Sequence, residues 1–207
     1  PAQLADKLEL TVLPLSFTIN GKEHYNYLDG RDISSSHFYR LLREGTQCTT
    51  SAANTNAFLS AMEPVLKKGK DILCICFSSA LSTTCASAQM AAKELVLKYP
   101  NNKIYIVDSL SASLGQGMLT YYAVQQKQNG KTIEQVYQWM EQNKLHLCHW
   151  FTVDDLNHLK RGGRISPAVA FVGSLLGMKP ILHVDDTGHL VNVGKIKGRR
   201  ASLSQLV

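Results

Sequence analysis

Two clusters of small hydroxyl side chains are the residues of this chain best suited to bind a ligand. The first is residues 49–51 (TTS), just before a predicted helix, and the second lies between Ser78 and Thr84, directly after the apolar run DILCICF. Hydroxyls donate hydrogen bonds without carrying a charge, and the N-terminus of a helix attracts anions. Ser and Thr are also ordinary helix caps, but five of them in seven positions exceed what a cap requires. The pattern therefore favours an anion-binding site over simple capping.

Enzymatic interpretations of the second cluster lack their usual partners. Ser78 or Ser79 could act as a hydrolase nucleophile, but neither glycine of a GxSxG turn is present. No phosphate-binding GxxxxGK followed by Ser or Thr occurs, and the pair Gly115 and Gly117 lacks the third glycine of a dinucleotide fingerprint. Asp108 ends a predicted strand, a position that suits a catalytic acid and a turn residue equally well. A hydrolase or phosphotransferase that uses the serines with Asp108 is the enzymatic alternative, and an interaction module with an apolar cleft for a peptide or another lipid is the non-enzymatic one.

Histidine and cysteine spacing does not favour a metal site. His146 and His149 flank Cys148, but no second pair of ligands follows at a suitable spacing. Five cysteines are an odd number for a disulfide framework, and Cys74 and Cys76 lie in an apolar strand pattern without polar neighbours. We therefore expect five reduced thiols in a cytoplasmic protein, with no metal and no cofactor.

Composition limits the classes of partner. The 207 residues carry a formal net charge of +6, which suits an anionic ligand or an acidic partner surface. The basic residues do not form a stripe with interleaved aromatic residues, so nucleic-acid binding is not expected. No run approaches the roughly 20 apolar residues that a membrane-spanning helix needs, and the chain does not open on a signal peptide. We expect no stable membrane insertion.

Strands and helices alternate along residues 1–150, which predicts an α/β fold with a parallel sheet. Residues 71–77 and 104–107 are continuous apolar runs, typical of strands buried on both faces. Residues 132–135 (TIEQ) form a capping box that begins a helix. The other predicted elements are a strand over 10–17, helices around 37–43, 58–66 and 85–95, and a helix over 114–128 with Leu114, Met118 and Tyr121 on one face.

The pattern changes near residue 151, and we place a domain boundary between 1–150 and 151–207. Two apolar runs, 181–184 and 190–193, flank the turn sequence DDTG, which predicts a β-hairpin. Before them, Gly162 and Gly163 precede Arg164, which could bind a carboxylate or phosphate or could be an ordinary surface charge. The uncharged helix predicted after Ser166 could belong to the core or line a ligand tunnel.

Five segments in order resemble the DegV family of bacterial fatty-acid-binding proteins. The segment FTVDDLNHLKRGGRIS is close to the most recognisable family signature, and FSSALSTT resembles its SS-x-LSGT motif. The other three segments are TSAAN, IYIVDSLSASLGQG and GMKPILHVDDTGHLVNVGKIKGRRA. The resemblance spans nearly the whole chain and implies a two-domain fold, with an N-terminal parallel-sheet α/β domain and a second α/β domain that contains hairpin strands.

The resemblance also implies a function. A protein of this kind holds one long-chain fatty acid, such as palmitate, stearate or oleate, in an apolar tunnel. It presents the acid to a fatty acid kinase, which makes the acyl phosphate for phospholipid metabolism, so the protein is a carrier and not an enzyme. Residues that match the carboxylate-binding positions are Thr50, Ser51, Ser79, Ser82 and Arg164. Candidate tunnel-wall residues are Phe171, Leu175, Leu176 and Ile181, and candidate kinase-docking residues are Lys197 and Arg199.

The chain departs from the family pattern at several positions. TSAAN lacks the Gln-Pro-Ser of the family motif, Thr83 replaces a glycine, and Lys197 stands where an arginine is usual. The resemblance further implies a strand with its own Asp-Ser before Pro1, and a segment after Val207 with a histidine near the carboxylate. We expect the change at Thr83 to reshape the loop beside the head group.

Overall fold

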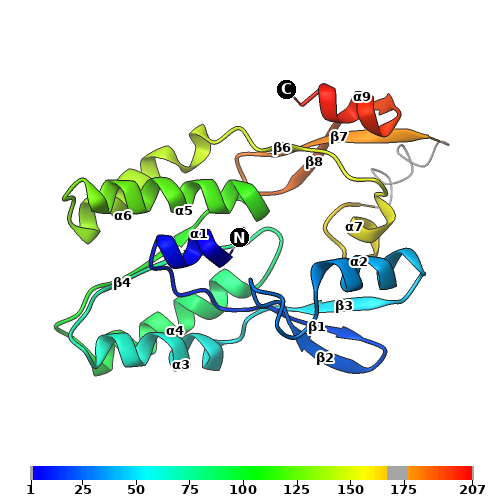
Figure 1. Cartoon of the computed structure of the whole chain (residues 1–207). Helices are drawn as coiled ribbons and strands as arrows, with labels where there is room; N and C mark the ends of the chain where they lie inside the picture. The colour runs from blue at the N-terminus through cyan, green and yellow to red at the C-terminus, as the bar shows by residue number, and fades with distance from the viewer. Residues whose placement is uncertain (1, 167–176, 207) are drawn as a thin grey trace.

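The computed structural model describes residues 2–166 and 177–206 (Figure 1). Secondary structure covers most of these residues, and the short helices and strands follow one another along the chain as the alternating sequence pattern predicts. The elements are α1 (Ala2–Lys7), β1 (Ser16–Ile19), β2 (Lys22–Tyr25), α2 (Ser35–Arg43), β3 (Cys48–Ser51), α3 (Thr55–Leu66), β4 (Ile72–Cys76), α4 (Thr84–Lys98), β5 (Ile104–Asp108), α5 (Ser113–Gln128), α6 (Ile133–Asn143), the 3-10 helix η1 (Lys144–His146), β6 (Trp150–Phe151), α7 (Asn157–Arg161), β7 (Met178–Val184), β8 (Leu190–Lys197) and α9 (Arg199–Ser204).

The central layer is the parallel pair β4 and β5, and helices cover both of its faces (Figure 1). Ile72, Cys74 and Cys76 point toward α3 and α4, while Leu73 and Ile75 pack against the cluster formed with α5 and α6. The apolar run has no polar alternation because both faces of the strand lie against helices. The prediction of a parallel α/β layer from residues 71–77 and 104–107 is confirmed.

Two antiparallel sheets complete the described structure. The first has the strand order β2-β1-β3, and the second has the order β6-β7-β8. β7 and β8 form the predicted hairpin, with Val184 opposite Leu190 at its turn. Leu182 is fully buried in this sheet, where it packs with Leu156 and Ile165. The mixed α/β class is therefore as predicted, whereas the domain division at residue 150 stays a prediction.

Two details differ from the sequence-based prediction. The strand predicted over 10–17 begins only at Ser16, because Pro14 has no N–H to donate to a strand ladder. On α5, Leu114, Met118 and Tyr121 share a face as predicted, but this face is exposed, and Leu119 and Ala123 provide the buried one. The helix has apolar residues on both faces, so periodicity alone did not identify the core-facing side.

The residues at helix ends predicted the helix boundaries better than periodicity predicted the buried faces. The side chain of Thr132 accepts a hydrogen bond from the backbone N–H of Gln135, and the Gln135 side chain accepts one from the backbone N–H of Thr132. This is the predicted capping box, and it begins α6. Pro64 lies inside α3, which ends two residues later at Leu66, as expected where proline cannot donate a backbone hydrogen bond.

Candidate functional site

The second hydroxyl cluster forms a loop at the carboxyl ends of the parallel strands. Residues 78–83, called the serine loop below, join β4 to α4. The backbone N–H of Ser78 donates to the carbonyl of Ser111, and that of Ser109 donates to the carbonyl of Cys76, so the segments after β4 and β5 are fastened together. Ligands of open α/β sheets bind at this end of the strands. The loop therefore has the position expected of a ligand site.

Ser78 is the structural residue of the loop. Its side chain is fully buried, and its Oγ donates to the carbonyl oxygen of Gly188 across 2.9 Å. The same Oγ accepts a hydrogen bond from the N–H of Ala80 across 3.3 Å. A buried hydroxyl with both roles occupied is neither an accessible nucleophile nor a free donor for a ligand.

Ser79 has the opposite environment. Its backbone N–H donates to Oδ1 of Asp108 across 3.2 Å, which turns the residue outward. Its side chain is exposed, and the hydroxyl makes no hydrogen bond within the described residues. The same Asp108 oxygen also accepts from the N–H of Leu110, so Asp108 organises the turns after both strands. Of the two roles that the sequence left open for Asp108, the structure gives the turn role.

Ser82 and the residue that follows it begin α4. Ser82 Oγ lies 2.8 Å from Oγ1 of Thr84 and accepts a hydrogen bond from the backbone N–H of Thr84 across 3.2 Å. Thr83 occupies the N-cap position but makes no side-chain capping bond, and its side chain is exposed. The half-buried Ser82 side chain therefore satisfies one of the free backbone N–H groups at the start of α4. Thr83, where the family motif has glycine, leaves the capping of α4 to its neighbour.

The first hydroxyl cluster lies on a neighbouring strand. Thr50 and Ser51 are on β3, where they face Phe17 and Ser16 of β1. Neither is the cap of the next helix, because Oδ1 of Asn54 accepts the N–H of Ala57 across 2.9 Å. The hydroxyls of Thr50 and Ser51 are exposed and make no hydrogen bond in the part of the chain that the structure describes. Both are available to a ligand.

The two clusters rest on one core. Ala53, two residues after Ser51, and Cys85, three residues after Ser82, are buried in the same apolar cluster. Packing between α3 and α4 sets the separation of the two segments. Both segments also lead into the N-terminus of a helix, α3 or α4, where backbone N–H groups add to the positive potential.

Arg164 connects the hairpin half of the chain to the serine loop. It follows α7 in the segment KRGGR, and its Nε donates to the carbonyl oxygen of Leu81 across 3.1 Å. Its Nη1 donates to the carbonyl of Gly162. The side chain therefore lies beside the loop that carries Ser79 and Ser82, the neighbourhood that the resemblance implied.

The remaining candidate residues are divided between described and undescribed segments. Ile181 is buried on β7, and its place in a tunnel wall stays a prediction. Phe171, Leu175 and Leu176 lie outside the described residues. Lys197 at the end of β8 is exposed, and so is Arg199 at the start of α9, whose Nε lies 3.6 Å from Oδ1 of Asp154.

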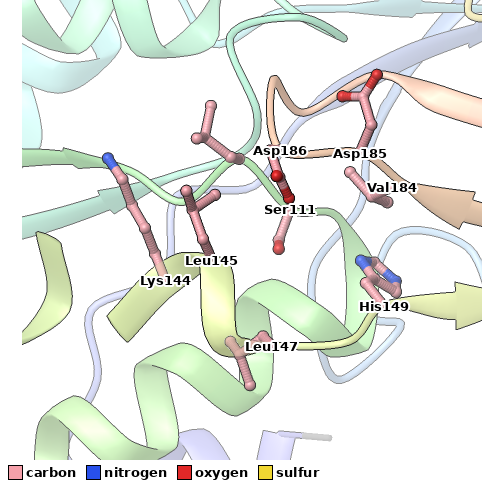
Figure 2. Close-up of a pocket in the computed structure, with 9 residues that line it drawn as sticks. Ser111, Lys144, Leu145, Leu147, His149, Val184, Asp185 and Asp186 are labelled. Atoms are coloured by element: carbon pink, nitrogen blue, oxygen red, sulfur yellow. The ribbon is translucent and has the colours of Figure 1, made fainter. Parts of the chain in front are cut away.

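A small polar cavity lies between the segment after β5, the segment before β6 and the hairpin turn (Figure 2). Its volume of about 20 Å³ has room for one water molecule and none for an acyl chain. Ser111 from the segment after β5, His149 before β6, and Asp185 and Asp186 of the hairpin turn contribute to its walls. The cavity therefore lies where the hairpin turn, residues 185–188, meets the segment after β5, residues 109–111. This contact region is called the seam below.

His149 is the unusual group beside this cavity, and sequence analysis considered it only as a disfavoured metal ligand. Its ring packs so closely on α5 that a Cβ atom at Gly115 would lie 2.5 Å from Nδ1. Nδ1 is buried and has no hydrogen-bond partner among the described residues. Burial lowers the pKa of this imidazole, so the neutral form is favoured. No sequence signal predicts the contact, because it joins a helix glycine to a residue 34 positions later.

The thiols behave as the sequence predicts. All five cysteines are free. Cys76 and Cys85 are buried, and a hydrogen bond with a neighbouring thiol, together with burial, raises the pKa of each. Such thiols stay protonated and unreactive. Among residues 2–166 and 177–206, no group of three histidine, cysteine or acidic side chains could hold a metal ion. No helix in those ranges is long and apolar enough to cross a membrane.

Comparison with known proteins decides the family. The family model described as "Uncharacterised protein, DegV family" matches residues 1–207. The chain belongs to the DegV family. A DegV domain-containing protein of Clostridium perfringens is 47% identical over 206 residues, which cover 100% of this chain and 70% of that protein. The resemblance read from the five motifs is therefore confirmed.

Solved DegV structures agree with the fold. A DegV family protein from Thermus thermophilus, described as binding fatty acid, is 29% identical with a TM-score of 0.83, over 99% of this chain and 70% of its own. DegV of Bacillus subtilis, described as a fatty acid binding protein, is also 29% identical with a TM-score of 0.83, over 100% of this chain and 71% of its own. The predicted DegV-like α/β fold is thus confirmed.

Proposed function

We propose that this protein binds one long-chain fatty acid and presents the acid to a fatty acid kinase. The DegV proteins of Thermus thermophilus and Bacillus subtilis, which share its fold, are both described as binding fatty acid. The observation that carries the proposal for this chain is the set of exposed hydroxyls without hydrogen bonds in the described residues, on Thr50, Ser51 and Ser79. They lie at the sheet edge and helix ends where an anion is best stabilised.

The proposed head-group site consists of these three hydroxyls with Ser82 and Arg164. A carboxylate carries one charge, which two or three hydroxyl donors and a nearby guanidinium can balance. Neutral donors leave the carboxylate accessible to a kinase, whereas deep burial in several ion pairs would not. The acyl tail would lie in an apolar tunnel with Ile181 in its wall, and burial contributes about 0.8 kcal/mol for each methylene.

The proposed partner of this protein is a fatty acid kinase that acts on the bound acid. In this role the protein is a non-catalytic carrier in the cytoplasm and needs no cofactor. Lys197 and Arg199 are exposed cations suited to an acidic docking surface. The enzymatic alternative has little support, because Ser78 is buried and hydrogen-bonded while Asp108 holds two backbone N–H groups.

Analysis of the bound lipid tests this function directly. Organic extraction of the purified protein, followed by mass spectrometry, should release C14–C20 fatty acids in about one equivalent per chain. The variant with both Thr50→Val and Ser82→Ala should retain several-fold less acid, because each change removes a donor to the carboxylate. The proposal would be contradicted by an extract with no acid, by one with only a peptide or a sterol, or by full retention in the double variant.

A further inference from the structure

The hairpin turn reaches the serine loop through one buried hydrogen bond. Ser78 Oγ donates to the carbonyl oxygen of Gly188, 110 residues away in the sequence, across 2.9 Å. Gly188 is itself buried in the turn between β7 and β8. This contact is part of the seam between the parallel sheet and the hairpin sheet, where hydrogen bonds are shielded from water and their geometry is held more rigidly.

The contact is too close for any residue other than glycine at position 188. A Cβ atom there would lie 2.2 Å from Ser78 Oγ and 3.3 Å from Leu110. The backbone φ of +82° also favours glycine. Space and conformation together therefore fix how closely the hairpin turn approaches the loop.

Ser78 in turn shapes the rest of the serine loop. Its carbonyl accepts the N–H groups of Leu81 and Ser82 across 3.1 and 3.2 Å, and its Oγ accepts the N–H of Ala80. The loop is a single turn built around this residue. At its far end the carbonyl of Leu81 is bound by Arg164, which also comes from the hairpin half of the chain.

We infer that Ser78 is a positioning residue that couples the seating of the hairpin turn to the orientation of the head-group hydroxyls. Ser78 does not touch the ligand. It fixes the turn from which Ser79 points outward, and Gly188 fixes Ser78. If the hairpin turn shifts away, the loop loses the bond that holds its first residue, and the orientation of Ser79 and Ser82 is no longer fixed. The ligand part of this inference rests on the proposed fatty-acid binding.

A double-variant cycle tests the coupling. Ser78→Ala should speed the release of a bound fluorescent fatty acid by about three- to tenfold, the effect of one lost buried hydrogen bond. Gly188→Ala should speed release more, because its Cβ collides with Ser78 Oγ. In the double variant that oxygen is gone, so Ser78→Ala should partly suppress the defect of Gly188→Ala. Suppression would show that the two residues act through one contact. General destabilisation by each variant would instead give additive effects on the release rate.

Two matched controls are available in the chain. Gly130 has a φ of +84° but open space around its Cβ position, so Gly130→Ala imposes the same backbone strain without the collision. Ser60 is exposed on α3, so Ser60→Ala removes a hydroxyl without a buried partner. Neither control should change the release rate by more than about twofold.

Amide hydrogen exchange of the ligand-free protein distinguishes this inference from the proposed function. In Ser78→Ala, the amides of residues 80–82 should exchange several-fold faster, while those of α6 keep the wild-type rate. That readout does not depend on a ligand, so a protein that binds no fatty acid would contradict the proposed function and leave the coupling tested. Additive release rates together with unchanged exchange at 80–82 would overturn the inference.

Discussion

Ser78 and Ser79 are adjacent residues with opposite roles. Ser78 is buried and fully hydrogen-bonded, whereas the exposed hydroxyl of Ser79 has no partner in the described part of the chain. The sequence predicted an anion site from the number of hydroxyls but could not separate the two kinds. The separation depends on which hydroxyl meets the hairpin turn, and that contact is not local in the sequence.

At the residue scale, Ser79→Ala should weaken fatty-acid binding without weakening the fold. The lost hydroxyl makes no intramolecular bond, so the free energy of unfolding should change by less than about 0.5 kcal/mol. Retention of extracted fatty acid, or the affinity for a fluorescent analogue, should fall by about three- to tenfold. Urea denaturation and lipid extraction of Ser79→Ala and of the control Ser60→Ala provide the comparison. Unchanged retention in Ser79→Ala would remove this residue from the site.

At the scale of elements, the packing of His149 on α5 should make the stability of the folded protein depend on pH. Burial lowers the pKa of His149 in the folded protein below its unfolded value of about 6.5. The unfolded chain therefore binds the proton first as pH falls, and the folded state loses stability below about pH 6.5. The loss continues down to the folded pKa and cannot exceed about 1.4 kcal/mol per pH unit for one proton.

Urea denaturation between pH 5 and pH 8 measures this effect. The variant His149→Gln should show a smaller decrease of the unfolding midpoint below pH 6.5, because it has no imidazole to protonate. His37→Gln, at an exposed position on α2, is the control for loss of a histidine. An identical pH dependence in wild type and His149→Gln would contradict the prediction. The same cavity is also lined by the charged residues Asp185, Asp186 and Lys144. They are present in both proteins, so the difference between wild type and His149→Gln reports on the imidazole.

At the scale of the whole molecule, local sequence patterns predicted the sheets and the helices that cover them. They did not predict the contacts between segments that lie far apart in the sequence. The run ILCIC of β4 is apolar on both faces because α3 and α4 cover one face and α5 and α6 the other. The hairpin of β7 and β8 followed from its turn sequence. The bond from Ser78 to Gly188 and the packing of His149 on Gly115 had no periodic signal, since each joins segments that meet only after folding.

For the proposed kinase partnership, the charge distribution of the whole molecule suits docking through residues 151–207, called the hairpin half. Residues 151–207 contain eight basic and four acidic side chains, so they carry most of the net charge of +6. Because this half also binds the serine loop through Arg164 and Gly188, a partner that docks on it would lie near the proposed head group. Electrostatic complementarity mainly accelerates association, and added salt reduces the effect.

Charge reversal at this surface tests the kinase partnership. Lys197→Glu together with Arg199→Glu should lower the rate of acyl-phosphate formation by a fatty acid kinase about tenfold at low salt, with a smaller difference at high salt. Extracted fatty acid should stay at the wild-type level, because neither residue belongs to the proposed head-group site. Lys127→Glu, an exposed lysine on α5, introduces one reversed charge outside the hairpin sheet and should leave transfer nearly unchanged. Equal transfer rates for the double variant and the wild type at low salt would place kinase docking elsewhere on the molecule, while a parallel loss of bound acid would assign these cations to ligand binding.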